Sequence, residues 1–113
     1  MFPASATVTV VAVFVRPDGR PESGWVYFEP TVSPVLYEDA TIVGNVSRAE
    51  LSEDGTMRAV LLDPTASGVE PSGWHYKVTQ AFLGCATESY TVSIPSGTPT
   101  DTRLNLGTLP RVV

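Results

Sequence analysis

The feature that most constrains the fold is the regular recurrence of turn signals. Clusters of proline, glycine, serine and acidic residues divide the chain into segments of roughly 8–12 residues, a spacing typical of all-β sandwiches and barrels. Apolar and polar residues alternate within these segments, and none shows a sustained helical period with caps. The pattern predicts an all-β fold: a single antiparallel β-sandwich of about seven or eight short strands, with at most one helical turn near residues 64–68.

The first predicted strand spans residues 6–15 and is dense in β-branched residues. One of its faces carries Val8, Val10, Ala12 and Phe14, which predicts the core side of the strand. The other face begins with threonines and continues with valines, so we expect its second half to be covered by another part of the structure; these valines are Val11, Val13 and Val15.

Composition limits the classes of partner. The chain has 113 residues, of which 42% are hydrophobic and 17% charged, which predicts one packed domain over 1–113. Its net charge is −5 and its seven Lys and Arg are spread out, which argues against nucleic-acid binding. No run reaches the roughly 18 apolar residues of a membrane span. Residues 1–15 have no basic segment ahead of the apolar run, so we interpret them as leading into a strand rather than as a signal peptide.

Residues capable of catalysis or metal binding are few. His75 is the sole histidine and no GxSxG motif occurs, so a surface role for His75 is favoured over a catalytic one. Cys85 is the only cysteine, which rules out an intramolecular disulfide and a zinc site built from cysteines, and no cation lies nearby in sequence to activate it. Asp54 and Asp63 lie in acidic turns without the alternating ligands of an EF-hand loop. We therefore expect no enzymatic activity and no cofactor.

The most informative motif occurs twice. SGWVY at residues 23–27 and SGWHY at 72–76 each follow a proline and a glutamate, and each places a tryptophan and a tyrosine two residues apart. Trp25, Tyr27, Trp74 and Tyr76 allow two interpretations, an exposed platform that stacks on sugar rings or part of the sandwich core. Core packing is favoured, with the glycine permitting a close backbone approach and the tryptophan closing the end of the core.

These motifs together resemble the small Ig-like β-sandwich module found in virion proteins of tailed bacteriophages that infect actinobacteria. The resemblance extends over most of residues 7–95 and lies in a Pro-Asp-Gly turn before a Gly-x-Val-x-Phe-x-Pro strand, a middle turn, the second tryptophan motif and a last strand. The matching residues are Pro17, Asp18, Gly19, Gly24, Val26, Phe28, Pro30, Leu51, Asp54, Gly55, Pro71, Gly73, Trp74, Tyr76, Val78, Tyr90, Ile94 and Pro95.

The resemblance implies a non-enzymatic structural protein of the virion, assembled in the host cytoplasm. In minor tail proteins this module usually precedes further segments, whereas this chain ends at Val113, so we expect an accessory protein such as a capsid decoration protein or a small minor tail component. Its expected partners are the major capsid or tail protein and further copies of itself, contacted through terminal arms at 1–5 and 108–113. The alternative is a carbohydrate-binding module that adheres to a host-surface glycan.

Overall fold

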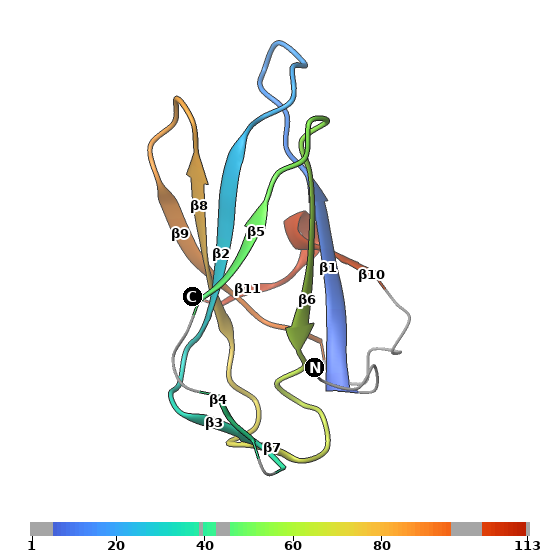
Figure 1. The fold of residues 1–113 in the computed structure, drawn as a ribbon, viewed down its shortest axis with the longest axis vertical. Coiled ribbons are helices and arrows are strands. Elements are labelled where there is room, and N and C mark those ends of the chain that lie inside the picture. The colour runs from blue at the N-terminus through green and yellow to red at the C-terminus, as the bar shows by residue number, and fades with distance from the viewer. Residues whose placement is uncertain (1–5, 39, 43–45, 96–102, 113) are drawn as a thin grey trace.

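The computed structural model describes residues 6–38, 40–42, 46–95 and 103–112, with the side chains of 40–42 excepted. Its strands form three sheets (Figure 1), and the all-β prediction is confirmed. In the order of the sheet, the five-stranded sheet contains β11 (Arg111–Val112), β9 (Glu88–Val92), β8 (Tyr76–Phe82), β2 (Gly24–Pro30) and β5 (Ser47–Glu50). The three-stranded sheet contains β10 (Arg103–Asn105), β1 (Thr7–Val13) and β6 (Thr56–Leu62). A third, small sheet contains β4 (Ala40–Ile42), β3 (Val35–Tyr37) and β7 (Val69–Glu70).

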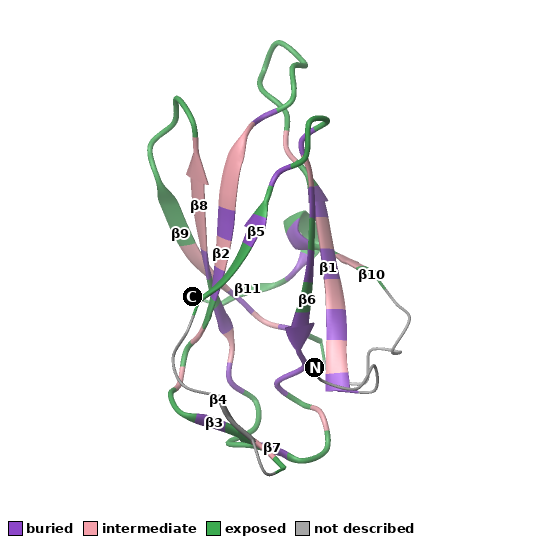
Figure 2. Cartoon of the chain, in the orientation of Figure 1, coloured by how far each residue is buried: buried purple, intermediate pink, exposed green. Residues whose placement is uncertain are grey.

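The two larger sheets enclose one hydrophobic core, which gives the molecule a sandwich-like architecture (Figure 2). Alternation decides which side chains enter this core. On β1, Val8 and Val10 are buried while Val13 is 65% exposed. On β2, Val26 and Phe28 are buried between the sheets. The predicted inner face of β1 is therefore confirmed at Val8 and Val10, and the inward residues of β6 and β8 complete the core: Met57, Ala59, Leu61, Tyr76 and Val78.

The prediction that every strand pair is antiparallel is wrong at one edge. β1 pairs in parallel with β10, with Val10 opposite Leu104, while its other neighbour β6 is antiparallel. The chain reaches β10 after β9, which belongs to the opposite sheet, so no hairpin dictates the direction of β10. The described residues also contain more strands than expected, because the connections contribute short pairs such as β3 with β7.

The C-terminal residues are part of the fold. Leu109 is buried, and Arg111 and Val112 pair with β9 after a 3-10 turn over Leu106–Thr108. Residues 108–112 are therefore not a free arm, because burial of Leu109 and the β11 ladder hold this segment against the body, and their contact with a partner stays a prediction. Residues 64–68, where at most one helical turn was expected, form turns and a bend without a helix. The N-terminal arm at 1–5 lies outside the described residues.

Candidate functional site

Two of the four candidate aromatic residues belong to the core. Trp74 and Tyr76 are 5% and 4% exposed, and their rings meet edge to face at 5.0 Å between centroids. The Tyr76 hydroxyl donates a hydrogen bond to the carbonyl oxygen of Leu62 at 2.7 Å. Burial raises the pKa of Tyr76, with a smaller contribution from the charge of Asp63. These two side chains pack as a core pair and offer no stacking surface for a sugar.

The other two aromatic residues lie on the outside of the five-stranded sheet. Val26 and Phe28 occupy the core side of β2, so Trp25 and Tyr27 point outward, where both are half-buried. The Arg48 guanidinium lies 4.1 Å from the centroid of the Trp25 ring, a cation–π contact supplied by neighbouring strand β5. We call Trp25, Tyr27 and Arg48 the aromatic face. The expectation that Trp25 closes the core is therefore wrong.

The repeated SGW motif has two different structural roles. Trp25 lies within β2, whereas Trp74 precedes β8, which begins at Tyr76. Gly24 has φ +135°, and a Cβ atom there would lie 2.3 Å from the backbone oxygen of Ala81 on β8. At Gly73 a Cβ atom would meet nothing within 4 Å. The predicted close backbone approach is confirmed at Gly24 and is wrong at Gly73, because only Gly24 sits within a paired ladder.

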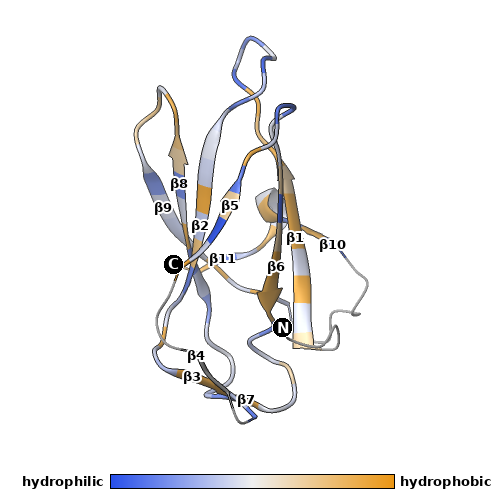
Figure 3. Cartoon of the chain, in the orientation of Figure 1, coloured by the Kyte–Doolittle hydropathy of each residue, from blue (hydrophilic) through white to orange (hydrophobic). Residues whose placement is uncertain are grey.

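A second exposed surface lies on the outside of the three-stranded sheet. Val13 and Val60 are 65% and 51% exposed, and Val11 between them is half-buried. Arg58 and Arg103 share this side, since their strand partners are Val11 and Thr9. We call Val11, Val13, Val60, Arg58 and Arg103 the valine face. In Figure 3, several segments of β1 have the orange colour of hydrophobic residues.

The valine face departs from what the sequence led us to expect. Val11, Val13 and Val15 were predicted to be covered, yet Val13 and Val15 are mostly exposed in the single chain, Val15 at 57%. Among the described residues of these three strands, the outward positions include two arginines and no carboxylate. In a chain of net charge −5 this makes the valine face locally basic as well as apolar. Neither arginine was chosen from the sequence as a candidate functional residue, although alternation predicts that Arg58 lies on the face of its strand that points away from the core.

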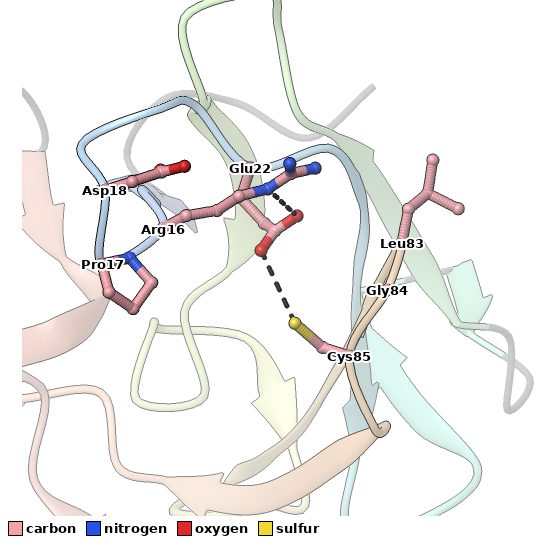
Figure 4. Close-up of a pocket in the computed structure, with 7 residues that line it drawn as sticks. All are labelled: Arg16, Pro17, Asp18, Glu22, Leu83, Gly84 and Cys85. Atoms are coloured by element: carbon pink, nitrogen blue, oxygen red, sulfur yellow. Dashed lines mark hydrogen bonds and ion pairs between the residues drawn. The ribbon is translucent and has the colours of Figure 1, made fainter.

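A polar cluster joins the tips of two hairpins (Figure 4). Glu22 is only 6% exposed and lies between Arg16 and Cys85. Its Oε1 is 3.5 Å from Arg16 Nε, and its Oε2 accepts a hydrogen bond from Cys85 Sγ at 3.6 Å. Its Oε1 also accepts a hydrogen bond from the backbone N–H of Ser23. Desolvation and the neighbouring Glu22 carboxylate raise the pKa of the Cys85 thiol. The thiol is thus a donor that joins the two hairpins, and its raised pKa disfavours the nucleophilic thiolate.

The remaining candidates do not converge. Asp54 accepts hydrogen bonds within its own turn from Ser52 and Thr56, and Asp63 accepts two from Thr65. Nδ1 of His75 is buried and has no hydrogen-bond partner among the described residues, so neither an acid nor a nucleophile engages it there. The part of the chain that the structure describes contains no group of three His, Cys, Asp or Glu side chains placed to hold a metal ion. Nor does any helix there have the length and apolar character needed to cross a membrane.

The fold and its surfaces define an all-β, sandwich-like protein that presents two chemically distinct sheet faces. No protein-family model matches the chain. A search of curated proteins likewise finds no match.

Proposed function

We propose that the chain is a non-enzymatic structural protein that attaches to a larger assembly through its valine face. The observation that carries this proposal is the exposure of Val13 and Val60 beside Arg58 and Arg103 on one sheet. An exposed apolar patch with a charged surround is typical of a protein–protein contact. The partner that fits is a protein surface with an apolar centre and acidic residues around it.

The larger assembly in this proposal is the virion of a tailed phage, as the resemblance to the Ig-like module of virion proteins implies. Within it, the chain is an accessory protein of the particle, either a capsid decoration protein or a small minor tail component. Many copies on a symmetric lattice turn weak individual contacts into durable attachment. A modest apolar face such as this one, with few large side chains, is suited to that mode of binding.

Incorporation into particles tests the proposal. Val13→Asp places an acid on the valine face, and Leu83→Asp is a matched control because Leu83 is also 65% exposed but lies on a hairpin tip. Tagged variants are expressed during growth of the phage that encodes the chain, and particles are purified by density gradient. We expect Val13→Asp to reduce incorporation at least tenfold and Leu83→Asp to leave it unchanged. Equal incorporation of both variants, or no tagged chain in the particles, would contradict the proposal.

The aromatic face supports a second candidate, adhesion to a host-surface glycan. Trp25 and Tyr27 lie two residues apart on one strand, which separates them by about 7 Å and matches adjacent sugar rings. Trp74 and Tyr76 cannot contribute because they are buried. Arg48 covers part of the Trp25 ring, so a sugar must displace the guanidinium or bind beside it.

Tryptophan fluorescence separates this second candidate from the first. In Trp74→Phe, all tryptophan emission comes from Trp25, so binding of an envelope polysaccharide from the host should shift that emission. Trp25→Phe should abolish binding while leaving incorporation into particles intact. An emission spectrum that does not respond to saturating polysaccharide would remove the glycan candidate.

A further inference from the structure

The outer edge of β6 is a long strand edge without a partner among the described residues. β6 spans seven residues and lies at the end of the sheet order β10-β1-β6. Its ladder with β1 runs without interruption from Thr56 to Leu62, so the strand contains no bulge, and it contains no proline. Bulges and prolines are devices by which natural proteins protect sheet edges from pairing with another chain.

Two backbone contacts at the ends of this ladder establish which groups face the free edge. Phe14 N–H donates to the Gly55 carbonyl, and Asp63 N–H donates to the Ala6 carbonyl. In an antiparallel pair the hydrogen-bonded positions recur every second residue. Met57, Ala59 and Leu61 therefore bond to β1, and the even-numbered residues of β6 direct their N–H and C=O groups outward.

Only the middle of this edge is available for pairing. The Thr56 carbonyl accepts from the Ser52 N–H, and the Leu62 carbonyl accepts from the Tyr76 hydroxyl. No hydrogen bond to the outward N–H and C=O groups of Arg58 and Val60 is found within the described residues. Both residues are exposed, so a second strand can approach these groups.

We propose that β6 pairs antiparallel with β6 of a second copy, about a two-fold axis at Ala59. This register places Arg58 opposite Val60 of the other copy and Val60 opposite its Arg58. Each pair exchanges two backbone hydrogen bonds, so the four bonds use the four unpaired groups of each strand. The result is a continuous six-stranded sheet in which the same patch of each copy contacts the other.

The side chains of β6 favour a two-fold axis at Ala59 over an axis at Arg58 or at Val60. With the axis at Ala59, the aliphatic stem of Arg58 covers Val60 of the other copy, which is 51% exposed in the single chain. An axis at Arg58 would place two arginines directly opposite each other, which is unfavourable. An axis at Val60 would oppose Arg58 with Leu62, whose carbonyl is already bonded to Tyr76. The register at Ala59 is the one that uses only free groups and opposes no like charges.

This inference goes beyond attachment to a larger assembly and is tested on the purified chain alone. Sedimentation equilibrium up to about 1 mM should show a concentration-dependent mass that approaches twice 12.1 kDa. Val60→Lys should weaken the dimer at least tenfold, because the introduced ammonium group then opposes Arg58 of the other copy. Val13→Lys, the same change on the same face but away from the edge, should leave it unaffected.

A charge exchange tests the register itself. Adding Arg58→Glu to Val60→Lys places an acid opposite a base at both pairs, and should restore dimerisation. In NMR spectra of the wild type, the Arg58 and Val60 amides should become protected from exchange as concentration rises, with Ala59 unchanged. Thermal melts of each variant verify folding. A wild type that stays monomeric at about 1 mM, equal effects of the two lysine variants, or no rescue by the double variant would each overturn the proposal.

Discussion

Replacing Gly24 with alanine should destabilise the protein far more than the same change at Gly73. Both glycines have positive φ, +135° and +76°, so alanine at either position carries a backbone cost of about 1–2 kcal/mol. At Gly24 the new Cβ would also lie 2.3 Å from the Ala81 oxygen and 2.8 Å from the Phe82 Cα. These are backbone atoms of the adjacent strand, so β2 and β8 must separate to admit the methyl group. Such overpacking adds about 1–3 kcal/mol.

The expected losses are therefore about 2–5 kcal/mol for Gly24→Ala and about 1–2 kcal/mol for Gly73→Ala. Alanine also lowers the entropy of the unfolded chain, but this gain is the same at both positions and cancels in the comparison. At about 4 °C per kcal/mol, the melting temperature should fall by about 8–20 °C for the first variant and about 4–8 °C for the second. Urea titrations give the free energies of unfolding. Equal losses for the two variants would refute the view that strand contact, rather than φ alone, requires glycine at residue 24.

Three further predictions test other parts of the structure. Trp74→Ala should cost about 3–5 kcal/mol in urea unfolding and Trp25→Ala less than about 1 kcal/mol, and a reversed order would contradict their assigned positions. Deletion of residues 108–113 removes buried Leu109 and β11, so a calorimetric scan should show a lower melting temperature; an unchanged scan would mean that this segment is a free arm. Hydrogen bonds from Ser52 and Thr56 hold the pKa of Asp54 below its ordinary value of 3.8, so its contribution to stability is present above pH 3.8 and is lost as pH falls through the lower folded pKa. The free energy of unfolding, measured between pH 5 and pH 2, should therefore fall less steeply in Asp54→Asn than in the wild type. Parallel curves for the two proteins would contradict a lowered pKa of Asp54 as the cause.

Much of the core could be predicted because alternation is a local property. Val8, Val10 and Ala12 were assigned to one face of the first strand, and all three are buried. Trp74 and Tyr76 were likewise assigned to the core, where they lie. In each case one face of the segment is more apolar than the other or carries the larger side chains, so the choice between faces needs no knowledge of neighbouring strands.

Features set by distant parts of the chain could not be predicted in the same way. The parallel pairing of Val10 with Leu104 joins residues far apart in sequence, and no local pattern specifies the direction of the second strand. The cluster of Glu22 with Cys85 likewise depends on two hairpins ending side by side. Turn residues predict where each hairpin reverses but not which tips meet.

The position of Trp25 shows where alternation stops being informative. Both faces of β2 are apolar, with Trp25 and Tyr27 on one side and Val26 and Phe28 on the other, so periodicity separates the faces without saying which is buried. The neighbouring strand decides, because β5 presents Arg48 on the side of Tyr27 and Ala49 on the side of Val26. A charged residue next to Tyr27 and a small apolar one next to Val26 are compatible with only one orientation of the sheet. On the three-stranded sheet, Val11 and Val13 lie beside Arg58 and Thr56 in the same way, and this pairing leaves the valines outside. The exposed positions of the aromatic face and the valine face are thus a consequence of strand pairing, which the sequence of a single strand does not reveal.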